Sequence, residues 1–511
     1  MKPFVLTGGV GLCLSVSTFA AQSSASFVTP EGLFSQAVTS FGARLRVSGD
    51  TAIVGCRPSR YGAGTSAAYF YDRTASGWTY AQTFGGASRY SISVDISGDR
   101  AVVGAPYISG EKMYIYERTS GTWALHQIID GYLDGHDWFG EAVAIEGDWA
   151  AVTAPDSIHI AGPIYLYQRG AANWTAAGIL SDVSGWGLYG GQLDISLPRL
   201  IGGDPEYEGH GAAHVYLLPA FGGATNAEVF LESPDWDDDD KFGTSVAIEG
   251  DRAVVGAPLH DIAGLLSTGA AYVFERVGGA WQFRSKLIGN PPTYAERVGS
   301  AVALDGERIL VGGNGTAYLF ELSGTQWVQS ARIAAPGASV NFGNAVALEG
   351  TRMLVGARDV QQVHAYTVTP GPIMYCTAKV NSQGCSPAIG FTGVPSATLA
   401  QPFAITAANV LNNKFGTLFY GTSGRLAAPF QGGFQCVAPP RQRTGLQWSA
   451  GNAGSDDCSG AYSYDLNARI QSGIDPALAA GVTVDAQYWT RDGQASFQTG
   501  LSNALELVIT P

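Results

Sequence analysis

The sequence predicts an all-β protein in which a unit of 44–56 residues occurs seven times and is followed by a smaller β domain. Gly accounts for 68 of the 511 residues, and short apolar runs alternate with Gly-containing turns, as is typical of strands joined by tight hairpins. Aromatic residues make up 11% of the chain and charged residues only 14%. Since disordered chains show the opposite balance, we expect most of this chain to fold.

The clearest copy of the repeat begins at Phe242-Gly243. An apolar run at 245–248 leads to a turn at Gly250-Asp251, where Gly tolerates the positive φ that a two-residue hairpin needs. A second apolar run ends in Gly256-Ala257-Pro258, and an aromatic-rich run follows at 270–276. The second run is apolar on both faces, which predicts a strand buried between two layers.

Seven copies are recognised by their opening pairs, which are Phe41-Gly42, Tyr90-Ser91, Phe139-Gly140, Tyr189-Gly190, Phe242-Gly243, Val298-Gly299 and Phe342-Gly343. A Trp opens a fourth strand in five of them, at Trp78, Trp123, Trp174, Trp281 and Trp327. Four antiparallel strands in each of seven copies predict a seven-bladed β-propeller over residues 21–369. The seventh copy lacks its Trp strand. Residues around 26–28 supply it in our interpretation, and a loose N-terminal tail is the alternative.

A second domain is predicted at 375–511, after a linker at 370–374 that contains Pro370-Gly371-Pro372. Its β-rich segments suggest a small sandwich-like fold. Four Cys lie in it, which predicts two disulfides and allows three pairings: Cys376, Cys385, Cys436 and Cys458. We expect near neighbours to pair, Cys376 with Cys385 and Cys436 with Cys458, because these pairs close short loops. Reduced core thiols or a metal site are the alternatives.

The first 20 residues have the order of a secretory signal peptide: Lys2, an apolar stretch, then small residues before a cleavage position after Ala20. No other stretch has the length and apolar character to span a bilayer. The expected location is therefore outside the cell or at its surface. The formal net charge of −14 argues against nucleic acid as a partner, since nothing here would neutralise a phosphate backbone.

The repeat resembles the FG-GAP repeat, the unit of the integrin α-subunit β-propeller and of many exported bacterial proteins. The resemblance covers about residues 27–369 and rests on Phe242-Gly243 and Gly256-Ala257-Pro258. It implies recognition of a partner protein or a glycan rather than a reaction. In calcium-binding members a ligand loop joins the first two strands. Here a two-residue turn does so in most copies, too short for a cation that takes about 6–8 oxygen ligands, so those sites do not carry over.

Candidate site residues lie mainly in the connections before the opening pairs. Asp235, Asp237 and Asp239 alternate as calcium ligands would, but Asp240 stands where such a loop needs a turn-making Gly, which favours a solvated acidic loop. Trp138, Trp186 and Trp236 are candidates for a binding face, the alternative being that they pack over the strand ends. No catalytic motif is present.

We therefore predict an exported binding or adhesion module that is not an enzyme, is monomeric and recognises an extracellular protein or glycan. No cofactor is expected, with calcium as the alternative. A polysaccharide-active enzyme with carboxylates in the propeller mouth is the second interpretation, and it requires clustered carboxylates with shifted pKa values. A structural surface-layer component is the third.

Overall fold

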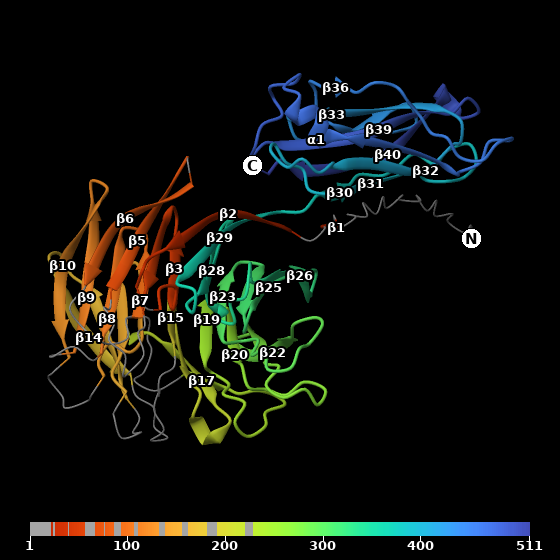
Figure 1. Ribbon diagram of the computed structural model, residues 1–511. Coiled ribbons are helices and arrows are strands. Elements are labelled where there is room, and N and C mark those ends of the chain that lie inside the picture. The colour runs from red at the N-terminus through yellow and green to blue at the C-terminus, as the bar shows by residue number, and fades with distance from the viewer. Residues whose placement is uncertain are drawn as a thin grey trace, which may run out of the picture. The chain divides into compact units, whose positions relative to one another are not determined.

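The computed structural model describes residues 22–23, 26–38, 40–56, 67–75, 77–85, 93–106, 111–131, 138–155, 162–180, 192–219 and 228–510. The chain forms two compact units (Figure 1). The larger holds Phe27–Val368, and the smaller holds Thr369–Pro511 together with the N-terminal residues up to Ser26. The predicted signal peptide lies outside the described residues. Within the described part of the chain, no helix has the length and apolar character needed to cross a membrane.

The described part of the larger unit contains seven four-stranded antiparallel sheets. Sheets one to three consist of β3 (Arg44–Ser48), β4 (Thr51–Gly55), β5 (Ala67–Thr74) and β6 (Gly77–Gly85); β7 (Ser93–Ser97), β8 (Arg100–Ala105), β9 (Lys112–Thr119) and β10 (Thr122–Asp130); and β11 (Val143–Glu146), β12 (Trp149–Thr153), β13 (Ile164–Arg169) and β14 (Trp174–Leu180). Sheets four and five consist of β15 (Leu193–Ser196), β16 (Arg199–Asp204), β17 (Ala212–Leu217) and β18 (Val229–Leu231); and β19 (Ser245–Glu249), β20 (Arg252–Ala257), β21 (Ala270–Val277) and β22 (Ala280–Leu287). Sheets six and seven consist of β23 (Ala301–Asp305), β24 (Arg308–Gly312), β25 (Thr316–Ser323) and β26 (Gln326–Ala334); and β27 (Phe342–Glu349), β28 (Arg352–Ala357), β29 (Gln362–Thr369) and β2 (Phe27–Ser35).

These strands confirm the repeat predicted from sequence. A two-residue turn joins the first two strands of every sheet, including the fourth, where Leu197-Pro198 takes the place of a Gly-containing pair. The five Trp residues of the repeat all lie at the start of fourth strands. In the seventh sheet the strand beside β29 is β2, so the N-terminal segment does supply the missing strand.

The two glycine positions of the repeat meet where neighbouring sheets adjoin. Gly243 has a φ of +93°, and a Cβ on it would lie 2.1 Å from the carbonyl oxygen of Ala212 in the preceding sheet. Gly203 of that sheet lies against Gly243 in turn, since its Cβ would be 1.9 Å from the Gly243 carbonyl oxygen. Only Gly permits this approach of two backbones. The same contact joins Gly356 of sheet seven to Gly42 of sheet one, because a Cβ on Gly356 would lie 2.2 Å from the Gly42 carbonyl oxygen.

Apolar side chains fill the space between adjacent sheets. One cluster combines Ile201 and Val215 of sheet four with Phe242, Val246 and Val255 of sheet five, and all five side chains are buried. The aromatic residue of the opening pair thus anchors its sheet to the one before. Burying a Phe or Val side chain stabilises the fold by about 1.5–3 kcal/mol.

Hydrogen bonds also join consecutive sheets at six places, through the residue that precedes a two-residue turn. Its side chain accepts a backbone N–H from the turn of the next sheet, as in Gly98 N to Ser48 Oγ, Gly147 N to Ser97 Oγ, Leu197 N to Glu146 Oε2, Gly250 N to Ser196 Oγ, Gly306 N to Glu249 Oε2 and Gly49 N to Glu349 Oε2. The last of these bonds joins sheet seven to sheet one. The first strands contact one another in the same cyclic order, with β27 beside β3, which is a β-propeller-like arrangement.

The smaller unit contains two sheets that share one core. The larger sheet consists of β1 (Gln22–Ser23), β30 (Ile373–Tyr375), β40 (Thr499–Val508), β39 (Thr483–Arg491), β33 (Phe415–Gly421), β36 (Gln442–Arg443) and β37 (Gln447–Trp448). A three-stranded sheet of β31 (Ala388–Thr392), β32 (Ala404–Val410) and β38 (Gly460–Asp465) is accompanied by the hairpin β34 (Arg425–Phe430) and β35 (Gly433–Val437) and by helix α1 (Leu466–Gln471). Tyr488 of β39 stacks on Tyr462 of β38, with ring centroids 5.5 Å apart, and its hydroxyl donates to the Ile405 carbonyl of β32. The two sheets therefore pack face to face.

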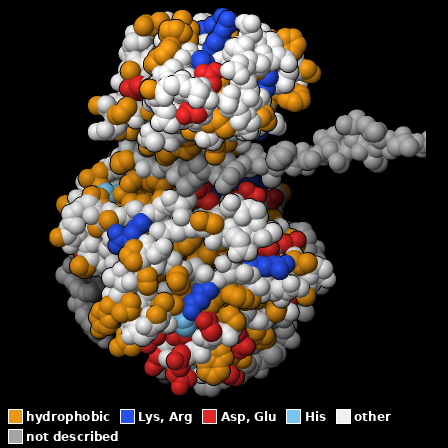
Figure 2. Space-filling model, turned by 90° about the vertical axis from the view of Figure 1, so that its right-hand side faces the viewer, with side chains coloured by type: hydrophobic (Ala, Val, Ile, Leu, Met, Phe, Trp, Pro, Cys, Tyr) orange, Lys and Arg blue, Asp and Glu red, His pale blue; other side chains and the backbone are white. Residues whose placement is uncertain are grey.

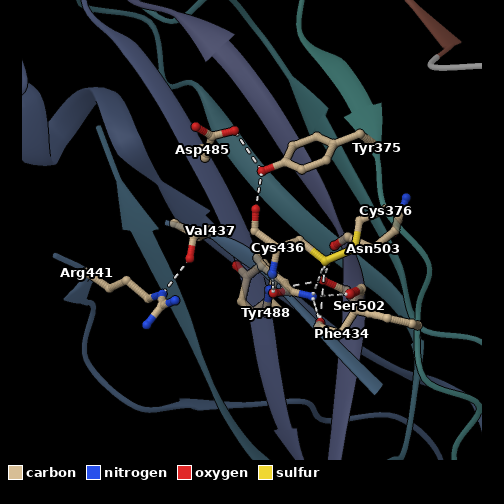
Figure 3. The surroundings of a disulfide bond; sticks show 11 residues. Tyr375, Cys376, Phe434, Cys436, Val437, Arg441, Asp485, Tyr488, Ser502 and Asn503 are labelled. Atoms are coloured by element: carbon tan, nitrogen blue, oxygen red, sulfur yellow. Dashed lines mark hydrogen bonds between the residues drawn. A yellow bond between two sulfur atoms is a disulfide. The ribbon is translucent and has the colours of Figure 1, made fainter. Parts of the chain in front are cut away.

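The expected disulfide pairing is wrong. Cys376 pairs with Cys436, and Cys385 pairs with Cys458. Cys376 directly follows β30, which pairs with β40, and β40 also contacts the β35 strand that carries Cys436. The Tyr375 hydroxyl lies 2.8 Å from the Cys436 carbonyl oxygen and 2.7 Å from Asp485 Oδ1, fixing β30 at this position (Figure 3). Strand pairing, rather than nearness in sequence, therefore decides which sulfurs meet.

Candidate functional site

Two regions of the larger unit bring polar side chains together. The first is a cavity of about 280 Å³ that the first strands of the sheets surround near their two-residue turns. Its acidic lining residues are Asp95, Glu146, Asp194, Glu249, Asp305 and Glu349. Arg46 is the one basic residue among the described residues that line it. This is the carboxylate cluster that an enzyme in the propeller mouth would require.

The two aspartates at the centre of this cavity are held by the backbone of the following sheet. Asp95 accepts from the Ile145 N–H at 2.7 Å and from Arg46 Nε at 3.1 Å, and Asp194 accepts from the Ile248 N–H at 2.8 Å. Burial raises the pKa of Asp95, and it raises the pKa of Asp194 to about 7, where Arg46 opposes the rise and the charge of Asp95 adds to it. Asp194 can therefore exchange a proton near neutral pH, although its hydrogen bond also gives it a structural role.

The second region is the connection before sheet five, which carries the three aspartates predicted as calcium ligands. Asp235 accepts from the Tyr272 hydroxyl at 2.9 Å and from Lys286 Nζ at 2.8 Å. Asp237 accepts from the Asp238 N–H, and the 83% exposed Asp239 carboxylate lies 3.5 Å from Lys241 Nζ. Among the described residues, no group of three or more His, Cys, Asp or Glu side chains is arranged to hold a metal ion. Calcium binding at this loop stays a prediction.

A buried polar network that the sequence did not suggest lies beneath this loop. His260 Nδ1 lies 2.7 Å from Asp240 Oδ2, and His260 Nε2 lies 2.6 Å from Lys286 Nζ. Since the ammonium group only donates, Nε2 accepts and Nδ1 carries the hydrogen that Asp240 receives. Lys286 also binds Asp235. Although burial raises the pKa of Asp235, its hydrogen bonds to Lys286 and Tyr272 lower it below the usual value.

Trp236 projects from the same loop. Its side chain is 53% exposed, and one face of the ring stacks on buried His210, with centroids 4.4 Å apart and planes inclined by 20°. Tyr207 and the partly exposed Phe230 extend this aromatic group. Acidic side chains gather at one end of the face of the larger unit that Figure 2 shows. Asp235 and Asp237 flank Trp236 in the chain, so this surface combines an exposed aromatic ring with neighbouring carboxylates.

Trp138, the second predicted Trp, lies in the connection before the third sheet. Trp138 is partly buried, and its backbone N–H donates to Glu111 Oε1 at 2.8 Å. Its φ of +70° makes it part of a tight connection before the third sheet. Trp186 lies outside the described residues. His210 lies just before β17 and His214 lies within it, and Trp236 and Tyr207 respectively contact their rings.

Comparison with known proteins gives one family match. The family model described as the FG-GAP repeat matches residues 226–274, which include part of sheet four and most of sheet five. No curated protein shows a significant match to the chain. The match coincides with the copy that carries both signature elements most clearly. The segment that bears Trp236, the acidic loop and His260 therefore contains an FG-GAP repeat.

Proposed function

We propose that the seven sheets close into a seven-bladed FG-GAP β-propeller and that the protein is exported and acts as a binding or adhesion module. Its ligand is an extracellular protein or a glycan, which it contacts through the surface around Trp236. The observation that carries this proposal is the exposed Trp236 ring stacked on His210. Trp residues that become buried when a partner binds contribute a large share of the binding free energy in many interfaces.

Two further observations support a binding role. The loop that presents Trp236 is tied down by Asp235 and Asp240, which bind Lys286 and His260. A surface that is already ordered loses little conformational entropy when a partner binds. FG-GAP repeats are also found in adhesion-type proteins, which fits the match at residues 226–274.

The test is a binding screen of the purified chain against glycan and polysaccharide panels and extracellular proteins, with and without EDTA. The variant Trp236→Ala should lose at least about tenfold in affinity for whatever ligand is found. Tyr80→Ala is the matched control, because Tyr80 is 54% exposed on the outer strand of sheet one. Equal losses in the two variants, or none in either, would contradict the proposal. Binding that EDTA abolishes would establish the calcium prediction.

The second candidate function is hydrolysis of a polysaccharide in the central cavity. Its specific support is the presence of Asp95 and Asp194 in one cavity, where the raised pKa of Asp194 suits a proton donor at neutral pH. The same panels are therefore assayed for released reducing sugar. Release by the native chain and its loss in Asp194→Asn would favour the enzyme over the binding module. Concentration-dependent self-association without any ligand would instead favour a structural surface component.

A further inference from the structure

A third polar region, formed by the connections of sheets six and seven, is lined by arginines instead of carboxylates. A cavity of about 690 Å³ opens among the connections that precede β23, join β24 to β25, lead into β27 and follow β28. Arg297, Arg332 and Arg358 line it, and no Asp or Glu is among its lining residues. In a chain with a formal net charge of −14, such a concentration of arginine is unexpected for a surface without a ligand.

Two acidic residues that do not line this cavity, Glu296 and Asp359, bind groups that do. The buried Glu296 accepts from the Thr316 hydroxyl at 2.5 Å and the Tyr318 hydroxyl at 2.8 Å, and it lies 3.6 Å from Arg332 Nη2. Asp359 accepts from the Ser339 hydroxyl and the Val340 N–H. These bonds fix the walls of the cavity, and Glu296 already occupies part of the Arg332 guanidinium.

Hydrogen bonds hold two of the three arginines at the cavity, and the third is exposed. Arg358 Nε donates to the neutral Asn341 amide at 3.2 Å, and Arg332 Nε donates to the Tyr318 hydroxyl at 3.2 Å. Arg297 is exposed and forms no ion pair with the residues that the structure describes. Each guanidinium has five N–H donors in a planar fork that matches carboxylate and sulfate groups.

We propose that this arginine cavity binds an acidic sugar segment, a chain of hydroxyl-rich rings that carry carboxylate or sulfate groups. The size of the cavity exceeds that of a single acidic side chain and suits a ligand of a few sugar rings. Asn314, Asn341 and Ser339 line it beside the arginines, and amide and hydroxyl groups are suited to sugar hydroxyls. Since no aromatic ring lines the cavity, charge and hydrogen bonds provide the recognition. This inference rests on the proposed binding role and names the ligand class for a site separate from Trp236.

The experiment is titration calorimetry on the purified full chain with oligogalacturonate, a heparin-derived oligosaccharide and a neutral cello-oligosaccharide. The expected result is binding of one or both acidic sugars, weakened by added salt, and no binding of the neutral one. Arg297→Ala and Arg358→Ala should each weaken this binding by at least about tenfold. Arg284→Ala on β22 is the control, because Arg284 is similarly exposed and pairs with Glu275 outside the cavity.

Several outcomes would overturn the inference. These are the absence of binding to both acidic sugars, equal affinity in the Arg297, Arg358 and Arg284 variants, or binding of polyglutamate at this site in preference to the sugars. Circular dichroism confirms that each variant is folded. The Trp236→Ala variant should bind the acidic sugars normally. If the arginine variants bind as the native chain does while another ligand depends on Trp236, only the arginine site is wrong. If the native chain binds neither an acidic sugar nor a Trp236-dependent ligand, the proposed binding module itself is refuted.

Discussion

Asp194 gives the sharpest test of the central cavity, because its pKa links the fold to pH. Burial raises this pKa from the ordinary value of 3.8 to about 7. A carboxyl group whose pKa is raised on folding stabilises the native state fully below the unfolded pKa, and that contribution is lost as the pH rises toward the native pKa. The larger unit should therefore lose stability from this group between about pH 4 and pH 7, where the unfolded chain is ionised and the native carboxyl is not.

The magnitude follows from the width of that window. Between about pH 5 and pH 7 the contribution of Asp194 to the free energy of unfolding falls by about 1.4 kcal/mol per pH unit. The total fall between pH 5 and pH 8 is about 2.6 kcal/mol. Asn cannot ionise, and its side-chain oxygen can still accept the hydrogen bond from the Ile248 N–H. The free energy of unfolding of Asp194→Asn, taken relative to the native chain, should thus rise by about 2.6 kcal/mol between pH 5 and pH 8.

The assay is urea denaturation followed by tryptophan fluorescence at both pH values. Asp99→Asn serves as the control, because it replaces an Asp by Asn at an exposed position, the two-residue turn of sheet two. Its stability relative to the native chain should hardly depend on pH. If Asp194→Asn shows the same stability difference from the native chain at both pH values, the cavity does not hold a protonated carboxyl group and the reasoning fails.

The remaining predictions concern the contacts between strands. Gly243→Ala should destabilise the larger unit by more than about 3 kcal/mol in urea denaturation, because the new Cβ would collide with a backbone carbonyl. Gly250→Ala is the control and should cost only about 1–2 kcal/mol, because Gly250 has open space around it. Equal costs for the two variants would refute the close approach of the backbones at Gly243. Replacing Cys376 and Cys436 by Ser should lower the melting transition of the smaller unit in calorimetry by the equivalent of about 4 kcal/mol, since the bond closes a separation of 60 residues, and leave the larger unit's transition in place. Deletion of 27–35 should expose the edge of β29 and cause self-association in light scattering, and a monomer of native stability would contradict its role in the seventh sheet.

Local sequence patterns were sufficient for the repeat because its signals act over a few residues. A Gly-Asp pair between two apolar runs favours a hairpin, as Gly250-Asp251 does between β19 and β20. Trp favours strands by its own side chain, and Trp281 lies at the start of β22. The fourth copy has no such turn pair, yet Leu197-Pro198 occupies the same place. There the neighbouring sheets impose the conformation, as the hydrogen bond from the Leu197 N–H to Glu146 shows.

The disulfides and the polar network depend on contacts between residues that are far apart in the chain. Cys376 and Cys436 meet because β30 and β35 both contact β40, which local patterns do not reveal. Asp235 and Lys286 are 51 residues apart, so the alternation of aspartates in the loop gave no information about this contact. Calcium binding by the loop stays a prediction.

The topology explains why ligand-binding candidates fall outside the repeat signature. Each first strand runs from its opening pair to a two-residue turn, and the second strand returns, so all these short turns lie at one end of the sheets. The longer connections, with Trp236, His260 and Arg297, lie at the other end. Carboxylates at the turn end, such as Glu249 and Glu349, are occupied in joining one sheet to the next. Both the aromatic surface around Trp236 and the arginine cavity occur at the loop end, where longer connections can vary without changing the strands.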